Sequence, residues 1–180
     1  MIYLCCAQRH ERAEHGILKR HQQLNLQSRV CTFVEGSDLD TSSVRVLVVE
    51  DSEPFRRFIC STLGKRPELQ IVGEVSDGLE AVHKVEELQP DLILLDIGLP
   101  TLNGIDAARR IRKVAPHSKI LFVSQESSTD VAQEALDLGA LGYVVKAHAG
   151  RELLVAVEAV RQGRQFVSAG FAGHVSAELG

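Results

Sequence analysis

Tryptophan is absent from the 180-residue chain, and two tyrosines and six phenylalanines are its only aromatic residues. The chain therefore has little of the aromatic surface on which nucleic-acid bases stack. It also lacks an excess of positive charge, because 20 basic residues oppose 24 acidic ones. Nucleic-acid-binding domains commonly present a basic face. Neither feature favours nucleic-acid binding by the bulk of the chain.

Long apolar segments are absent as well. No run approaches the roughly 20 residues that a membrane-spanning helix needs. Residues 1–7 are mostly apolar but are followed by charged residues from Arg9 onward, and they lack the basic start of a signal peptide. We therefore expect no membrane association.

Metal-binding and disulfide patterns are missing among the cysteines. Cys5, Cys6, Cys31 and Cys60 form no Cys-x-x-Cys pair, and no histidine cluster stands at zinc spacing. The simplest interpretation is four free thiols in a reducing cytoplasm.

The pattern of apolar and charged residues changes at Val44. Residues 1–43 mix charges with scattered apolar residues and end in a polar run, so we expect a poorly ordered extension. Residues 44–167 carry regular apolar segments and form the predicted domain. Residues 168–180 are small and polar, and we expect a tail or linker there.

Five short strand patterns alternate with five helical patterns in the predicted domain. The predicted strands are residues 46–49, 70–75, 92–95, 119–123 and 143–145. Residues 46–49 and 92–95 are continuous apolar runs, which are typical of strands that are buried on both faces. Strands that alternate with helices predict an α/β fold, a parallel sheet covered by helices on both sides.

Polar residues follow four of these strands directly. Glu50 and Asp51 follow the first, Asp96 the third, Ser124 the fourth and Lys146 the fifth. For one strand this is ordinary, since a strand must end in something polar. In open parallel sheets, however, ligands bind outside the carboxyl ends of the strands. Four such ends together therefore favour a functional site.

The residue types indicate phosphoryl transfer. Three clustered carboxylates repel one another and need a cation to remain charged together. Oxygen ligands suit Mg²⁺, a lysine suits phosphate, and an aspartate can itself attack phosphorus. In the loop after Asp96, Pro100 ends the regular backbone, and we expect Gly98 and Gly104 to let the chain turn closely around the carboxylate.

Residues 44–167 resemble the receiver domain of two-component response regulators. The motifs that carry the resemblance are specific in combination: Glu50-Asp51, Asp96 with Pro100 and Gly104, Ser124, and Tyr143 with Lys146. The segment from Asp96 to Pro100 and the last helix resemble the NarL/LuxR-type subfamily most. The resemblance implies a flavodoxin-like (βα)5 doubly wound sheet with strand order 2-1-3-4-5.

The resemblance also implies the chemistry. Asp96 is then the phosphoacceptor, and Glu50, Asp51, Asp96 and the Gly98 carbonyl hold Mg²⁺. The phosphoryl donor is a sensor histidine kinase or a phosphotransferase, and a homodimer on phosphorylation is one expected outcome. Such a domain is a signalling protein that assists its own phosphorylation and dephosphorylation, rather than a metabolic enzyme.

The resemblance assigns switch roles to three further residues. Ser124 is the switch hydroxyl, Tyr143 the switch aromatic residue and Lys146 the lysine that meets the phosphoryl group. Each has an ordinary alternative: Ser124 as a helix cap, Tyr143 as core packing and Lys146 as a surface lysine. We expect phosphorylation to draw Ser124 inward and to let the Tyr143 ring turn into the space beneath the following loop.

Two departures from the family pattern leave alternatives open. Ala147 follows the lysine where many receivers have proline. NarL-type regulators usually carry a helix-turn-helix domain after the receiver, and no DNA-binding domain is expected within this chain. A transcriptional regulator whose DNA-binding domain is absent from this chain is therefore one alternative. A Mg²⁺-dependent phosphatase of the haloacid dehalogenase type is less favoured, because Gly98 stands where such enzymes have a second aspartate.

Overall fold

The computed structural model describes residues 43–169. The expected extension of residues 1–43 and the expected tail of residues 168–180 lie almost entirely outside these described residues. The limits that we set for the three segments therefore stay a prediction.

A parallel sheet forms the centre of the described region, with strand order β2-β1-β3-β4-β5-β6. The order confirms the predicted flavodoxin-like α/β arrangement and extends it by one strand. The strands are β1 (Val44–Val49), β2 (Leu69–Val75), β3 (Leu92–Leu95), β4 (Lys119–Ser124), β5 (Gly142–Val145) and β6 (Phe166–Val167).

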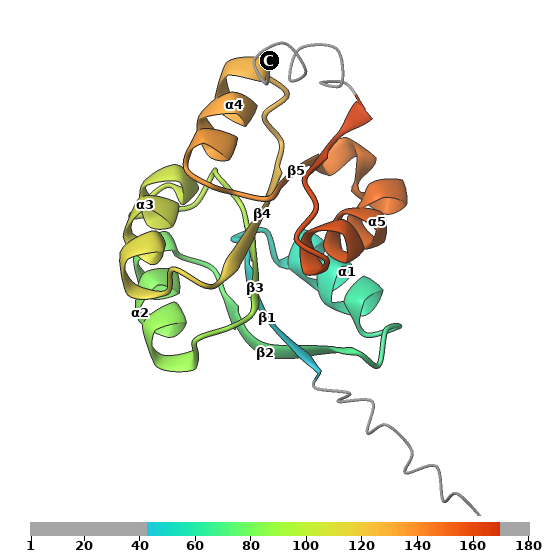
Figure 1. Ribbon diagram of the computed structural model, residues 1–180, viewed down its shortest axis with the longest axis horizontal. Coiled ribbons are helices and arrows are strands. Elements are labelled where there is room, and N and C mark those ends of the chain that lie inside the picture. The colour runs from blue at the N-terminus through green and yellow to red at the C-terminus, as the bar shows by residue number, and fades with distance from the viewer. Residues whose placement is uncertain (1–42, 170–180) are drawn as a thin grey trace, which may run out of the picture. The chain divides into compact units, whose positions relative to one another are not determined.

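Helices cover both faces of the sheet, as Figure 1 shows, with α2, α3 and α4 on one side and α1 and α5 on the other. Because each helix lies between two parallel strands in the sequence, the chain crosses from one end of the sheet to the other after every strand. The helices are α1 (Glu53–Leu63), α2 (Gly78–Leu88), α3 (Gly104–Val114), α4 (Thr129–Asp137) and α5 (Ala149–Arg161), and a 3-10 turn η1 (Lys146–His148) precedes the last of them.

Two apolar cores hold the layers together, one on each face of the sheet. Strand β3 contributes to both: Ile93 and Leu95 pack toward α2 and α3, and Leu92 and Leu94 pack on the opposite face. All four residues of β3 are at most 1% exposed. This confirms the prediction of a strand buried on both faces, and it leaves Asp96 to emerge at the end of the most enclosed strand.

The sixth strand was not predicted. Phe166 and Val167 pair in parallel with Gly142 and Tyr143 of β5. Ser168 then follows, completely buried. Its hydroxyl accepts a hydrogen bond from the N–H of Val145 at 2.9 Å, and its own N–H donates to the carbonyl of Tyr143 at 2.9 Å. The first residue of the expected tail thus packs as part of the sheet.

Candidate phosphoryl-transfer site

The strand order brings the predicted site residues to one edge of the sheet. Because β1, β3, β4 and β5 are consecutive neighbours, the residues after their carboxyl ends converge there. A cleft of about 250 Å³ opens at this edge, several times the roughly 30 Å³ that one water occupies in the liquid. Its walls comprise Asp51, Asp96, Ile97, Gly98, Ser124, Gln125, Glu126 and Lys146.

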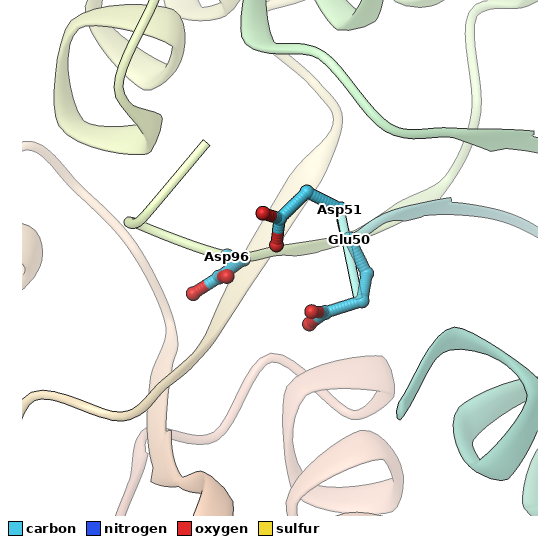
Figure 2. Close-up of side chains that lie close together, drawn as sticks. All are labelled: Glu50, Asp51 and Asp96. Atoms are coloured by element: carbon cyan, nitrogen blue, oxygen red, sulfur yellow. The ribbon is translucent and has the colours of Figure 1, made fainter. Parts of the chain in front are cut away.

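Three carboxylates meet at this edge (Figure 2). Glu50, Asp51 and Asp96 each offer an oxygen, and these oxygens all lie within 4.8 Å of one another. Their exposure differs, since Glu50 is 0% and Asp96 4% exposed whereas Asp51 is open to solvent. Burying like charges so close together is unfavourable unless a cation compensates them.

Lys146 supplies a compensating charge within the protein. Its Nζ donates to Oε1 of Glu50 at 2.8 Å and to Oδ2 of Asp96 at 2.7 Å, and its side chain is 9% exposed. Burial lowers the pKa of the ammonium, but the hydrogen bonds to Asp96 and Glu50 outweigh it, so the pKa of Lys146 is raised. The lysine therefore stays charged, and the surface alternative for it is wrong.

Glu50 is the most constrained of the three acids. Its pKa is raised, first because burial disfavours the charged carboxylate and further because Asp96 repels it, although Lys146 acts against both. Its Oε1 accepts from the N–H of Ser52 at 3.1 Å. Its Oε2 is buried as well and lies 2.8 Å from Nζ of Lys146. Both oxygens of this buried carboxylate are thus close to the Lys146 ammonium, which compensates their charge.

The loop after Asp96 holds the carboxylate in place. Oδ1 of Asp96 accepts from the N–H of Ile97 at 2.7 Å, and the N–H of Gly104 donates to the Ile97 carbonyl at 2.9 Å. A Cβ at Gly104 would lie 1.9 Å from the carbonyl oxygen of Asp96, so only glycine fits. We also expected that only glycine would let the chain pass closely at position 98. That expectation is wrong, because a Cβ at Gly98 would lie 3.7 Å from Oδ2 of Asp96, an ordinary contact.

Ser124 and Tyr143 are linked through the loop between β4 and α4. The Ser124 hydroxyl accepts from the N–H of Glu126 at 3.2 Å, and the Tyr143 hydroxyl donates to the carbonyl of Glu126 at 3.0 Å. Burial raises the pKa of Tyr143 to about 12, although a hydrogen bond with Ser124 acts in the opposite direction. The ring is completely buried, at 0% exposure, and its rotation on phosphorylation stays a prediction.

Phe55 is a site residue that the sequence did not reveal. The centre of its ring lies 5.0 Å from Nζ of Lys146, in the range of a cation–π contact. The available signal was its position on the first turn of the helix that follows Glu50 and Asp51, a turn that must begin beside the site.

The arrangement fits a hard divalent cation. Its donor atoms are carboxylate oxygens, which Mg²⁺ prefers, and Mg²⁺ typically keeps several waters that the open side of the cleft can accommodate. Glu50, Asp51 and Asp96 are the only such group of acidic, histidine or cysteine side chains among residues 43–169.

A family model now decides what kind of domain carries this site. The model of the response regulator receiver domain matches residues 46–158. The chain belongs to this family. The receiver fold and its role in two-component signalling are thereby established for the domain.

Individual relatives agree with this family. The chain is 40% identical over 127 residues to protein-glutamate methylesterase/protein-glutamine glutaminase of Thermotoga maritima, an alignment that covers 68% of the chain and 37% of that protein. It is 37% identical over 136 residues to the DNA-binding transcriptional activator DevR/DosR of Mycobacterium tuberculosis, covering 76% of the chain and 63% of that protein. The chain thus spans less than two thirds of either relative.

A solved structure supports the subfamily. A LuxR-family two-component response regulator from Aurantimonas sp. SI85-9A1 is 32% identical to this receiver, with a TM-score of 0.70. The superposition covers 73% of this chain and 94% of that one. The predicted likeness to NarL/LuxR-type receivers is confirmed. Among the described residues, no helix of this receiver is long and apolar enough to cross a membrane.

Proposed function

We propose that Asp96 of this receiver accepts a phosphoryl group from a sensor histidine kinase or a phosphotransferase, in a Mg²⁺-dependent reaction. The observation that carries the proposal is the placement of the Asp96 carboxylate: it follows the most buried strand, lies at the cleft, and is in contact with the Lys146 ammonium at 2.7 Å. A nucleophile, a fixed cation and an acidic pair for a metal ion then share one small site.

The covalent step is an in-line substitution at phosphorus. An oxygen of the Asp96 carboxylate forms a bond to phosphorus while the bond from phosphorus to the phosphohistidine nitrogen breaks. The departing imidazole nitrogen keeps the electron pair of that bond. The product is an acyl phosphate, which water can later hydrolyse back to the carboxylate and inorganic phosphate.

Glu50, Asp51 and Asp96, together with the backbone carbonyl of Gly98, would hold the Mg²⁺. When bound, the ion neutralises charge on the phosphoryl oxygens and so removes their repulsion by the carboxylates. The close approach of the three carboxylates and the oxygen-only donor set support this assignment.

Lys146 and Ser124 would receive the new phosphoryl oxygens. An ammonium has three N–H donors, and two of those on Lys146 point to Glu50 and Asp96, which leaves one for the phosphoryl group. The Ser124 hydroxyl lines the same cleft from the neighbouring strand. Tyr143 would transmit the change, because its hydroxyl bonds the loop that Ser124 also bonds.

The proposal makes this receiver a signalling switch in the cytoplasm that assists its own phosphorylation and dephosphorylation, with a homodimer as one consequence of the switch. The methylesterase and transcriptional activities named for its relatives are not carried over, because the chain spans 37% and 63% of those proteins.

Labelling by a small phosphodonor tests the proposal. The protein is incubated with acetyl phosphate and Mg²⁺, and incorporation is followed as hydroxylamine-labile phosphate. Incorporation should require Mg²⁺ and should be lost in Asp96→Asn. Asp106→Asn is the matched control and should leave labelling unchanged, since the Asp106 side chain on α3 is 46% exposed, pairs with Arg109 and does not line the cleft. Undiminished labelling of Asp96→Asn would overturn the assignment.

A further inference from the structure

Glu50 and Asp51 present a geometric problem, because they are adjacent residues whose carboxylates approach the same point. Successive side chains of an extended strand point to opposite faces. Oxygens of these two side chains nevertheless lie within 4.8 Å of each other and of Asp96. The backbone must therefore bend at this dipeptide, and the bend needs something to hold it.

The sheet holds only one side of the bend. The N–H of Glu50 donates to the carbonyl of Val75 on β2 at 2.9 Å, which ends the pairing of β1. The carbonyl of Glu50 instead accepts a hydrogen bond from Nη1 of Arg56 at 2.6 Å, and the Asp51 carbonyl lies 3.5 Å from the same nitrogen. The peptide between the two acidic residues is thus oriented by a side chain.

Arg56 is itself fixed at both ends. Its backbone is in the first turns of α1, where its N–H donates to the Ser52 carbonyl at 2.8 Å. Its Nε lies 3.5 Å from Oε2 of Glu74 on β2, and its side chain is only 19% exposed. A guanidinium can hold two partners in fixed directions because its donors are planar.

We infer that Arg56 is a positioning residue of the metal site. It orients the Glu50–Asp51 peptide so that both carboxylates face the ion, and it touches neither the ion nor the phosphoryl group. This inference rests on the proposed function, in which the acidic cluster binds Mg²⁺.

The direction in which Mg²⁺ affinity changes when Arg56 is replaced distinguishes a positioning role from a purely electrostatic one. A positive charge close to a cation site repels the cation, so removing the charge of Arg56 would tighten Mg²⁺ binding if charge were all that mattered. Removing a group that orients metal ligands has the opposite effect and typically weakens metal binding by 10- to 100-fold. We expect the weakening, roughly 10-fold.

The test compares Arg56→Gln and Arg56→Lys with Arg57→Gln in the full chain. Arg57 is the matched control because it is the next residue on α1, its side chain is 75% exposed, and it pairs with Glu53 at the surface. Mg²⁺ affinity is measured by calorimetry, thermal unfolding is recorded for each variant, and acetyl phosphate labelling is followed as Mg²⁺ is varied.

Arg56→Gln should require about 10-fold more Mg²⁺ for half-maximal labelling, with the parent rate regained at saturating Mg²⁺. Arg56→Lys should fall between Arg56→Gln and the parent, because one ammonium can still donate to the Glu50 carbonyl. Arg57→Gln should match the parent.

Unchanged or tighter Mg²⁺ binding by Arg56→Gln overturns the inference. If Arg56→Gln does not fold, the Mg²⁺ affinity of Arg56→Lys tests the inference instead. An Arg56→Lys affinity equal to that of the parent then overturns the inference. A parent protein that binds no Mg²⁺ contradicts the proposed function instead, so the two failures are distinguishable.

Discussion

At the scale of single residues, Glu50 shows how the site trades stability for function. It is completely buried, and Asp96 repels its carboxylate, although the Lys146 ammonium lies 2.8 Å away. Groups that are unfavourable in the folded protein are retained where function needs them. A neutral residue of the same shape should therefore make the protein more stable and less able to bind metal.

Glu50→Gln should raise the thermal unfolding midpoint at pH 7 when Mg²⁺ is removed with EDTA. Because the pKa of Glu50 is raised in the folded protein, its contribution to stability is fully present below its ordinary value of 4.5 and is lost as the pH rises through the raised pKa. Glutamine stays neutral at every pH. The difference in thermal unfolding midpoint between Glu50→Gln and the parent, measured by calorimetry, should vanish below pH 4.5.

Adding Mg²⁺ should make the parent more stable than Glu50→Gln, the reverse of the order expected in EDTA. A ligand that binds only the folded state stabilises it in proportion to the logarithm of its concentration over Kd. Saturating Mg²⁺ should stabilise the parent and have little effect on Glu50→Gln. A variant that is less stable than the parent in EDTA at pH 7 would instead show that the ion pair with Lys146 outweighs the cost of burial.

At the scale of secondary-structure elements, the start of α3 determines where Asp96 lies. Asn103 caps the helix by accepting from the N–H of Asp106 at 2.9 Å. Gly104 follows, with no room for a Cβ against the Asp96 carbonyl. The helix thus begins in direct contact with the backbone of the phosphoacceptor.

Gly104→Ala should destabilise the protein and lower its labelling, because the helix and the Asp96 loop must move apart to admit the methyl group. Backbone clashes of this kind cost about 1–3 kcal/mol. Gly150→Ala is the control, since a Cβ at this position of α5 would have nothing within 4 Å. Alanine is the better helix former by up to about 1 kcal/mol, so urea unfolding should show a gain for Gly150→Ala and a loss for Gly104→Ala. An equal change in stability for Gly104→Ala and Gly150→Ala would contradict this account of the loop.

Much of the site could be predicted from the sequence, because polar residues that directly follow buried parallel strands must lie at the carboxyl ends of those strands. Asp96 and Lys146 follow strands that are buried on both faces, so they had to emerge at the same edge of the sheet. Arg56 could not be found in this way, since its contacts depend on how far the guanidinium reaches across the turn. Gly98 and Gly104 looked equivalent in sequence, and only the approach of the Asp96 carbonyl distinguishes them.

At the scale of the whole molecule, the described residues form the receiver and its helical layers. The extra strand β6 escaped prediction because two residues are too few to show a period, and its partner β5 lies more than 20 residues earlier. The fold thus extends to Ser168, whose hydroxyl satisfies the buried N–H of Val145.

A fragment of residues 43–169 should unfold in one transition at the same midpoint as the full chain, because both apolar cores lie within it. A fragment that ends at Gln165 should be less stable by roughly 1–3 kcal/mol, since the Val145 N–H then loses its acceptor. Urea unfolding followed by circular dichroism distinguishes the two. A full chain markedly more stable than the 43–169 fragment would mean that the remaining residues pack on the receiver.

The location of the phosphoryl group tests the central claim most directly. After labelling with acetyl phosphate and Mg²⁺, borohydride reduces an aspartyl phosphate to homoserine, and mass spectrometry of the peptides identifies the reduced residue. The account predicts reduction at Asp96 and at no other carboxylate. Reduction at Asp51, or a stable phosphoester on Ser124 with Asp96 unmodified, would contradict it.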